Sequence, residues 1–377
     1  MYNISTLRVM ACAALISALA GCGLFGGSKI PALPDFSSSG TIKTLWQSSV
    51  SGSDDQVFVP AVAGNSIYAA GKNGEVIAFD AANGRQRWRI DAGQKLSGGV
   101  GAGDDMVVVG TAKGTLLAYD AKGKSLWKSE LAGEIVSPAT VDSRIVVARA
   151  ADGRLFGLDA ADGKRKWVYQ RATPPLSLRA PAGQAVSRGG LFAGFPGGKL
   201  VALDLATGGI GWEASVAQPR GSTELDRVAD VSSTPLIDDE RVCAVAYQGK
   251  LACFDLQNGN VVWSQDISSS TGLIADDKNI YVSDDRGTVQ AFDKKSGASI
   301  WKNTKLAGRR LGAPAVAGSR ILVGDVEGYV HALSVSDGAL MARISTDGSA
   351  VSAAPQASVD AIIMQTRRGG VYAFAAQ

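Results

Sequence analysis

The sequence reads Ser66-Ile-Tyr-Ala-Ala-Gly-Lys-Asn-Gly74-Glu-Val-Ile-Ala-Phe-Asp80-Ala-Ala-Asn-Gly84-Arg-Gln-Arg-Trp88 over one stretch that sets the fold. Its apolar, β-branched and aromatic residues form three short runs. Asn73-Gly74 and Asp80 to Gly84 separate these runs, and Asn, Asp and Gly are the residues that tight turns need. The stretch therefore predicts three short antiparallel strands joined by tight turns.

The same unit recurs along the chain with a period of about 40 residues, which is typical of a repeat architecture. The glycine of the first turn occurs eight times, at Gly74, Gly114, Gly153, Gly198, Gly249, Gly287, Gly328 and Gly369. The tryptophan keeps the same rhythm, at Trp46, Trp88, Trp127, Trp167, Trp212, Trp263 and Trp301. Four short strands per unit without a helical pattern predict an all-β, eight-bladed β-propeller with four-stranded antiparallel blades over residues 41–377.

The aspartate that ends the third strand of a unit also repeats, at Asp80, Asp120, Asp159, Asp204, Asp255 and Asp293. Its carboxylate can accept the backbone N–H groups of the following turn. The alternative role of these aspartates is metal binding or base catalysis. Six equivalent copies at equivalent positions favour the role in the turn. We interpret the repeated tryptophans as apolar plates between adjacent sheets.

The ends of the repeat suggest how the ring closes. Trp46 precedes the first complete unit, whereas the last unit stops at Phe374 without a tryptophan strand. We expect the strand from Thr41 to Ser49 to complete the last blade, which removes an open sheet edge. The seventh unit has Ser334 in place of the aspartate and Ala342 in place of the tryptophan, so weaker outer packing is expected there.

The N-terminus predicts export. Arg8 precedes the apolar run Val9 to Leu19, which is too short to span a membrane as a helix. The tetrapeptide Leu19-Ala20-Gly21-Cys22 resembles the lipobox of bacterial lipoproteins. That resemblance implies a signal peptide over residues 1–21 and a Cys22 that carries a diacylglyceryl thioether and an N-acyl chain. An ordinary cleaved signal with an incidental cysteine is the alternative.

Residues 22–40 are rich in Gly, Ser and Pro and are expected to form a flexible tether between lipid and fold. Several acyl chains anchor a protein stably, so the lipidated chain would be held at a membrane. Gly23 follows the cysteine, where Asp commonly signals inner-membrane retention in such lipoproteins. The resemblance therefore implies attachment to the outer membrane, on its periplasmic side.

Two segments in the middle of the chain are longer than the repeat requires. One contains Leu176, Leu178 and Arg179 beside prolines, and the other runs from Gln218 to Val231 with the acidic Asp230 near its end. Extra residues in a propeller emerge as loops on one face, which is commonly the binding face.

The motif (Phe/Tyr/Leu)-Asp-x₂₋₃-Gly-x₃-Trp and the lipobox resemble the eight-bladed propellers of the pyrroloquinoline-quinone type. The two middle loops narrow the resemblance to the lipoprotein family of the outer-membrane β-barrel assembly machinery. This resemblance implies a non-enzymatic scaffold that docks on the periplasmic POTRA region of BamA and aids insertion of β-barrel proteins. By this resemblance Leu176 and Leu178 are apolar anchors, Arg179 is a central hydrogen-bonding residue and Asp230 is an acidic contact. Ser232 stands where the family pattern has a second acid.

Other functions remain as alternatives. The loops could merely cover the rim, with Arg179 paired to a loop carboxylate. A quinoprotein dehydrogenase would need a Ca²⁺ site and a stacking aromatic, and no such cluster is visible, so we expect no cofactor, no metal and no catalytic residue. The single histidine, His331, lies on a predicted strand and is interpreted as structural.

The partners expected from the sequence are proteins and a membrane surface. The 38 Lys and Arg residues and the 35 Asp and Glu residues are interspersed, which argues against nucleic acid. Unfolded outer-membrane clients could pair with blade edges. A sugar or other ligand in the central channel is a further alternative.

Cys243 and Cys253 flank the turn at Gln248-Gly249 symmetrically. A bulged turn would place them opposite each other and allow a disulfide in an oxidising compartment. A two-residue turn would put them on opposite faces as buried thiols. The sequence leaves both arrangements open.

Overall fold

The computed structural model describes residues 29–376 except 55 and 181. The chain divides into two units, residues 1–33 and residues 34–377. The expected signal peptide (residues 1–21) and the expected lipidation site Cys22 lie outside the described residues. In the part of the chain that is described, no helix is long and apolar enough to cross a membrane.

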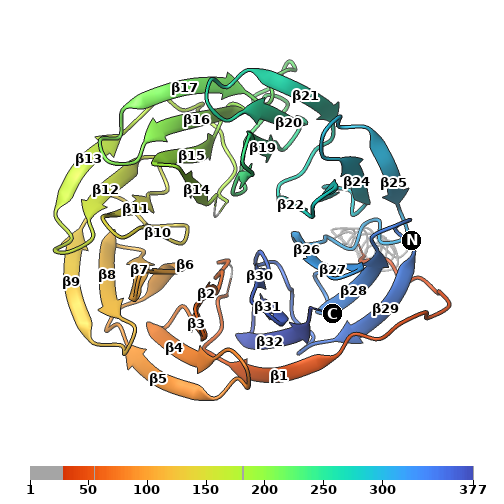
Figure 1. The fold of residues 1–377 in the computed structure, drawn as a ribbon, viewed down its shortest axis with the longest axis horizontal. Coiled ribbons are helices and arrows are strands. Elements are labelled where there is room, and N and C mark those ends of the chain that lie inside the picture. Colours follow the sequence, from red (N-terminus) through yellow and green to blue (C-terminus); the bar gives the residue numbers. More distant parts are fainter. Residues whose placement is uncertain (1–28, 55, 181, 377) are drawn as a thin grey trace, which may run out of the picture. The chain divides into compact units, whose positions relative to one another are not determined.

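The second unit is a ring of eight four-stranded antiparallel sheets (Figure 1). It is therefore the eight-bladed β-propeller that the repeat predicts. From the innermost to the outermost strand, blade 1 contains β2 (Ala61–Ala63), β3 (Ser66–Ala70), β4 (Glu75–Asp80) and β5 (Gln86–Asp91). Blade 2 contains β6 (Leu96–Gly103), β7 (Met106–Thr111), β8 (Thr115–Asp120) and β9 (Ser125–Glu130). Blade 3 contains β10 (Thr140–Val141), β11 (Ile145–Arg149), β12 (Leu155–Asp159) and β13 (Arg165–Tyr169).

The next blades follow the same order. Blade 4 contains β14 (Gln184–Ser187), β15 (Gly190–Phe195), β16 (Lys199–Asp204) and β17 (Ile210–Ser215). Blade 5 contains β18 (Leu236–Ile237), β19 (Arg241–Val245), β20 (Lys250–Asp255) and β21 (Val261–Asp266). Blade 6 contains β22 (Leu273–Ala275), β23 (Asn279–Ser283), β24 (Val289–Asp293) and β25 (Ser299–Asn303). Blade 7 contains β26 (Pro314–Ala317), β27 (Arg320–Gly324), β28 (Tyr329–Ser334) and β29 (Leu340–Ser345).

Blade 8 joins the two ends of the propeller. It contains β30 (Gln356–Ala357), β31 (Ala361–Gln365), β32 (Gly370–Ala375) and, outermost, the N-terminal strand β1 (Thr44–Ser49). Trp46 on β1 is the register partner of Ala373 on β32. The prediction that the N-terminal strand completes the last blade is confirmed, and β1 lies along β32 in Figure 1.

Each repeated tryptophan connects its blade to the next one. Trp46 donates its indole N–H to the carbonyl of Ala81 at 2.9 Å, and its ring lies against Gly84, whose φ is +68°. The other tryptophans lie in the same way against Gly123, Gly163, Gly208, Gly259, Gly297 and Gly338. The repeated aspartate holds this turn, as in Asp80, which accepts the N–H of Ala82 at 3.1 Å. The turn interpretation of the aspartates is confirmed.

The N-terminal segment, residues 34–42, packs on blade 7. Ile42 packs in the core cluster that contains Ala342, and Phe36 packs against the neighbouring cluster on the other side of blade 7. The backbone N–H of Ser39 donates to the carbonyl of Met341 at 3.0 Å. The expectation of a tether up to Gly40 is thus corrected, because residues from Pro34 onward pack on the propeller.

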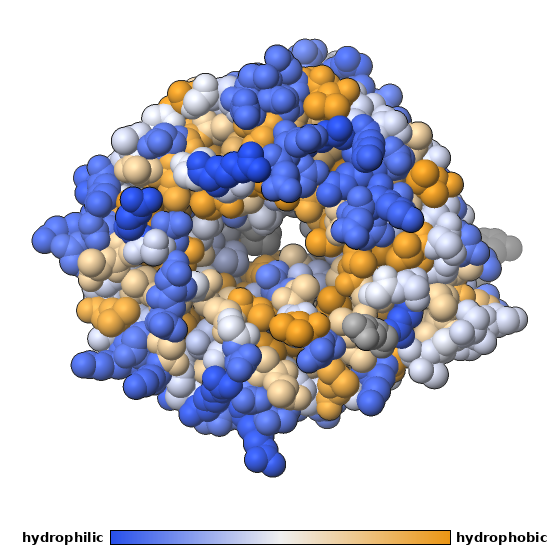
Figure 2. Space-filling model, viewed as in Figure 1, coloured by the Kyte–Doolittle hydropathy of each residue, from blue (hydrophilic) through white to orange (hydrophobic). Residues whose placement is uncertain are grey.

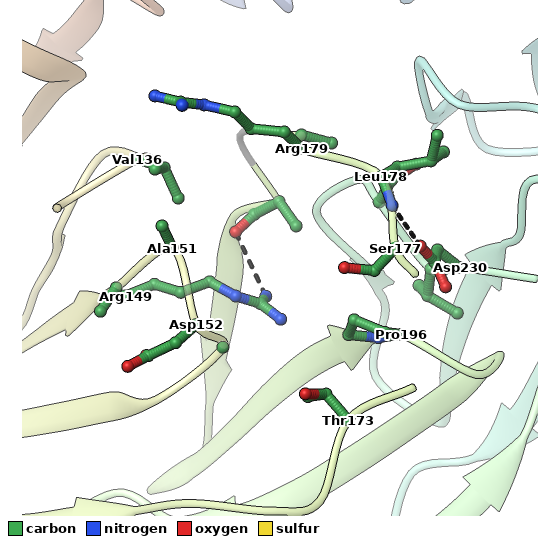
Figure 3. Close-up of a pocket in the computed structure, with 16 residues that line it drawn as sticks. Val136, Arg149, Ala151, Asp152, Thr173, Ser177, Leu178, Arg179, Pro196 and Asp230 are labelled. Atoms are coloured by element: carbon green, nitrogen blue, oxygen red, sulfur yellow. Dashed lines mark hydrogen bonds between the residues drawn. The ribbon is translucent and has the colours of Figure 1, made fainter. Parts of the chain in front are cut away.

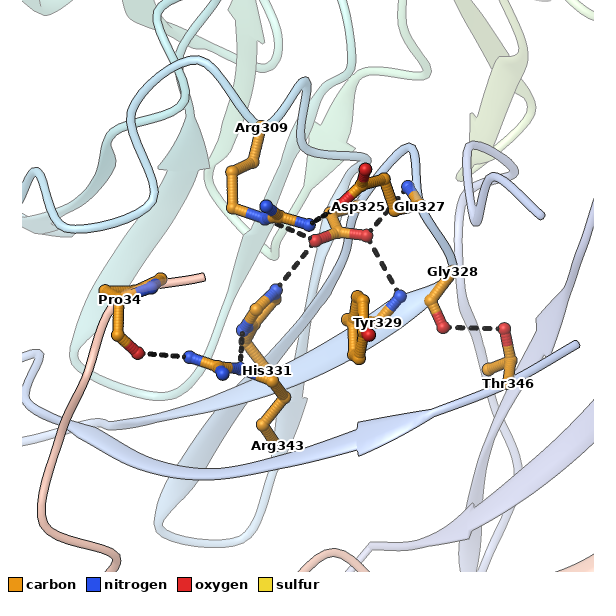
Figure 4. Close-up of polar contacts among 9 residues, drawn as sticks. All are labelled: Pro34, Arg309, Asp325, Glu327, Gly328, Tyr329, His331, Arg343 and Thr346. Carbon is orange, nitrogen blue, oxygen red and sulfur yellow. Dashed lines mark hydrogen bonds and ion pairs between the residues drawn. The ribbon is translucent and has the colours of Figure 1, made fainter. Parts of the chain in front are cut away.

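A buried polar network stabilises the same blade (Figure 4). The Arg309 guanidinium contacts the carboxylates of Asp325 and Glu327, each at 2.7 Å. Burial alone would raise the pKa of Asp325, but hydrogen bonds from His331, the Tyr329 backbone and Arg309 outweigh it and lower that pKa. The network is therefore charged at its centre although Arg309 and Asp325 are buried.

The histidine of this network is fully buried. Its Nε2 lies 3.0 Å from Asp325 Oδ2, and its Nδ1 accepts the Nε–H of Arg343 at 3.4 Å. Burial lowers the pKa of His331, so the neutral ring with its proton on Nε2 fits these contacts. Arg343 also donates to the carbonyl of Pro34 at 2.7 Å. His331 thus helps to hold the N-terminal segment, in agreement with its interpretation as structural.

The register of blade 5 resolves the arrangement of its two cysteines. Val245 pairs with Leu251, so a loop with an odd number of residues, centred on Gln248, joins β19 and β20. A loop with an odd number of residues places residues that are equally far from its central residue opposite each other. Cys243 and Cys253 are register partners, and the structure joins them by a disulfide.

Candidate partner-binding site

The two long middle loops emerge on the same face of the ring. Each blade has four antiparallel strands, so the chain leaves the outermost strand on the face where the next blade begins. Residues 170–183 link β13 to β14, and residues 216–235 link β17 to β18. The loops meet over blades 3 to 5, where they enclose a hollow (Figure 3). The intervals that exceed the repeat length therefore predicted where the loops lie in the sequence. The topology of the blades places both loops on one face.

The first loop presents an apolar and a basic side chain to solvent. Leu176 is 39% exposed, which is high for leucine. The side chain of Arg179 is 66% exposed, and its guanidinium donates to Glu134 Oε1 at 2.6 Å. Gln56 donates to the same carboxylate oxygen at 3.3 Å. The sequence left open that Arg179 pairs with a loop carboxylate. The structure contains such a pair, with Glu134, but most of the arginine side chain stays accessible.

Asp230 fixes the two loops to each other. Its Oδ2 accepts the backbone N–H of Leu178 at 2.6 Å, and its Oδ1 accepts the N–H of Gly197 at 3.0 Å (Figure 3). The side chain is 2% exposed. The sequence led us to expect that Asp230 offers an acidic contact to a partner. In the structure both of its carboxylate oxygens accept hydrogen bonds from the chain itself. Asp230 is a positioning residue that sets the place of Leu178.

The rest of the second loop forms a compact turn. The N–H of Thr223 donates to Asp226 Oδ2 at 3.1 Å, and the N–H of Asp226 donates back to Thr223 Oγ1 at 3.2 Å. Arg227 contacts Glu224 at 3.4 Å, and Leu225 is 71% exposed at the tip. The loop thus adds a second exposed leucine to the same face. Ser232 is buried and donates to the carbonyl of Ser270 at 3.1 Å.

The hollow between the loops has a volume of about 250 Å³ and is bordered by Leu178, Arg179 and Asp230 together with Arg149 of β11. Figure 3 shows the side chain of Arg149 extending into it. Its guanidinium donates to the carbonyls of Ala182, at 3.3 Å, and Gly194. The hollow therefore has a buried cation beneath the loop that carries the expected anchors.

Sequence reasoning missed Arg149. Two residues after each repeated turn glycine, the third strand of the blade carries a Val or Leu, such as Val76 after Gly74 or Leu155 after Gly153. Arg149 is the register partner of Leu155, and the corresponding residue of each blade is the partner of its Val or Leu. In the other blades this residue is Ala70, Gly110, Gly194, Val245, Ser283, Gly324 or Gln365. Aligning the second strands of the units would have revealed one arginine among mostly small residues.

The face of the ring that Figure 2 presents is mixed in polarity. Figure 2 shows hydrophilic residues projecting around the ring, hydrophobic residues between them and a hollow at the centre. Over the described part of the sequence, no three His, Cys, Asp or Glu residues are grouped so that they could hold a metal ion.

The comparisons with known proteins agree on one family. The family described as "Outer membrane protein assembly factor BamB" matches residues 39–97, 72–303 and 295–377. A protein of that name from Nitrosomonas eutropha is 47% identical over 337 residues, which cover 89% of this chain and 82% of the relative. The one from Escherichia coli is 31% identical over 375 residues, which cover 95% of this chain and 96% of the relative.

Solved structures show the same relationship. The crystal structure of BamB from Moraxella catarrhalis matches with a TM-score of 0.82 and 29% identity, over 89% of this chain and 99% of that one. Quinohemoprotein alcohol dehydrogenase from Comamonas testosteroni, at 14% identity and a TM-score of 0.72, covers 89% of this chain and 76% of its own and shares the fold alone. The chain therefore belongs to the family of the outer membrane protein assembly factor BamB.

Proposed function

We propose that this protein is a non-enzymatic scaffold that docks on the periplasmic POTRA region of BamA and aids the assembly of β-barrel proteins into the outer membrane. The names of its relatives support the general function. The observation that carries the docking site is the pair of exposed side chains, Leu176 and Arg179, on a loop that Asp230 holds in place.

The chemistry of this loop suits a protein interface. A few apolar anchors and an arginine commonly supply most of the binding energy at such surfaces. The ion pair between Arg179 and Glu134 is largely exposed on the arginine side, and exposed pairs contribute little to stability. Arg179 can therefore turn toward a partner at small cost, while Leu178, fixed by Asp230, keeps the loop in shape.

Attachment to the membrane belongs to the same proposal. Acyl chains on Cys22 would hold the propeller at the periplasmic side of the outer membrane. Residues 23–33 would then span the distance between the lipid and Pro34, where packing on the propeller begins. Metabolic labelling with a palmitate analogue, compared between the wild type and Cys22→Ser, tests this attachment.

The docking site is tested by measuring the affinity of immobilised POTRA region for purified variants. We expect Leu176→Ala and Arg179→Ala to weaken binding about tenfold or more. Arg188→Ala is the matched control, because Arg188 also forms an exposed pair, with Asp239 at 3.3 Å, but lies in the β14–β15 turn on the opposite face. Leu126→Ala, on β9 and 48% exposed, is the control for the leucine.

Unchanged affinity of both test variants would refute the docking site. The non-enzymatic part has its own test, in which the purified protein is incubated with pyrroloquinoline quinone and Ca²⁺. Stoichiometric quinone binding together with dye reduction would contradict a scaffold and favour a dehydrogenase.

A further inference from the structure

Arg149 is a buried cation without a counter-ion in the described chain. Its side chain is 4% exposed, and its guanidinium donates hydrogen bonds to the backbone carbonyls of Ala182 and Gly194. Its guanidinium also lies over the ring of Phe195, 4.8 Å from the centroid. No carboxylate among the described residues lies within ion-pair distance of it. Burial lowers the pKa of Arg149 to about 10, so the group is still a cation at neutral pH.

The other deeply buried arginine of the propeller shows what such a group normally requires. Arg309 is 1% exposed and contacts two carboxylates, those of Asp325 and Glu327. A buried charge is expensive unless it is paired, and effective penalties reach several kcal/mol. Arg149 carries the same charge at a similar depth with carbonyl oxygens alone. The environment of Arg149 thus lacks one anionic group.

The space for that group is the hollow between the loops. Its volume of about 250 Å³ is several times the share of one water molecule in the liquid, about 30 Å³. The acidic side chains that border it are already engaged, since Asp152 pairs with Arg154 at 2.6 Å and Asp230 accepts two N–H groups. The exposed residues Thr173, Ser177 and Arg179 also line it.

We propose that this hollow receives an Asp or Glu side chain of the docking partner, which pairs with Arg149. The inference rests on the proposed function and adds to it a second basic contact beneath Leu178. A guanidinium can hold a carboxylate by two parallel hydrogen bonds, which fixes direction as well as charge. The exposed Arg179 would attract the acidic group, and the buried Arg149 would hold it, because a desolvated pair is screened less than an exposed one.

The first test measures binding of immobilised POTRA region to Arg149→Met and Arg149→Lys. We expect Arg149→Met to lose affinity about tenfold or more, since removing one member of a buried charge pair is costly. Arg149→Lys should lose less, because it keeps the charge without the planar fork. Circular dichroism and thermal melting check that each variant folds.

The second test identifies the acidic residue and does not depend on the stability of one variant. Each Asp and Glu of the partner is changed singly to Asn or Gln and measured against the wild type and Arg149→Met. Neutralising one carboxylate of the partner should lower its affinity for the wild type and leave its affinity for Arg149→Met unchanged. If all acidic changes have the same effect on both proteins, the proposed pair does not exist.

A third measurement uses the free protein. Titration with sodium acetate should produce a saturable shift of a buried arginine side-chain ¹⁵N signal that is absent in Arg149→Met, whereas sodium chloride at equal ionic strength should not. No saturable shift would overturn the carboxylate site. Saturable acetate binding with unchanged partner affinity of Arg149→Met would also overturn the proposal, since the hollow would then serve a free anion.

The outcomes separate this inference from the proposed function. If Leu176→Ala and Arg179→Ala lose binding and Arg149→Met does not, only the pair with Arg149 is refuted. If none of the three variants loses binding, the docking site itself is refuted.

Discussion

The indole ring of Trp46 lies against Gly84 and donates its N–H to the carbonyl of Ala81 at 2.9 Å. Trp46 belongs to the N-terminal strand β1 of blade 8, and Gly84 belongs to the turn after β4 in blade 1. This contact joins the two blades between which the ring closes. The same pairing at the other tryptophans makes the Asp-x₂₋₃-Gly turn and the tryptophan two halves of one connection between blades.

A side chain at Gly84 should disrupt this connection. Its φ is +68°, and a Cβ there would lie 2.5 Å from the Trp46 ring. We expect Gly84→Ala to lower the free energy of unfolding by about 2–5 kcal/mol, through backbone strain and overpacking together. Gly64→Ala is the control, because Gly64 has φ +54° and open space around it. It should cost about 1–2 kcal/mol. Equal losses in chemical denaturation would show that the ring contact is unimportant.

The neutral state of His331 makes stability depend on pH. Burial lowers the pKa of His331 below the ordinary value of 6.5, so the unfolded chain binds a proton more readily than the folded one. Stability is therefore full above about pH 6.5 and decreases as pH falls toward the folded-state pKa. As His331 is the single histidine, its ring signals in a ¹H–¹³C NMR titration report this directly.

The variant His331→Phe provides the comparison. It should be less stable at pH 7.5 but show a smaller decrease in stability between pH 7.5 and pH 5.5, because the titrating group is gone. The Asp325 carboxylate has a lowered pKa and titrates below this range. A ring that titrates at or above pH 6.5 in the folded protein would contradict the buried neutral state.

Removing the charge of Asp230 should loosen the docking loop. Asp230→Asn places an amide N–H₂ against one of two backbone donors, so one hydrogen bond to Leu178 or Gly197 is lost. Hydrogen bonds to charged groups contribute about 1.5–3 kcal/mol each. We expect faster hydrogen exchange over residues 172–183 and weaker partner binding. Asp239→Asn, on a carboxylate that is 98% exposed, should change neither. Unchanged exchange in Asp230→Asn would show that the loop is held by other contacts.

The disulfide between Cys243 and Cys253 should stabilise blade 5. It closes a short loop, with a sequence separation of 10. The double variant Cys243→Ala, Cys253→Ala should lose about 2–3 kcal/mol in unfolding free energy under oxidising conditions. With reductant present, the wild type should approach the variant. Labelling of these cysteines by a thiol reagent in the unreduced, denatured protein would contradict the disulfide.

The repeat is what made the fold predictable. Equivalent copies of Asp80, Gly84 and Trp88 define equivalent turns and strands, and the unpaired Trp46 indicates how the ring closes. The prediction was less accurate where the repeat is interrupted. The substitution at Ala342 suggested weak packing, but Ile42 packs against the cluster that contains Ala342, and Phe36 packs against the cluster on the other side of blade 7. A segment outside the repeat has no periodic pattern that would show where it packs.

The sequence by itself determined the number of blades, the position of the two long loops and the candidates Leu176, Leu178 and Arg179. These features follow from local spacing, because each blade repeats the same short-range turns and alternation. The tertiary structure decided that Asp230 holds the loop from within and that Arg149 lies beneath it with no carboxylate of the described residues as its counter-ion. Burial and pairing depend on which residues from different blades meet around one hollow, and no spacing along the chain specifies that meeting.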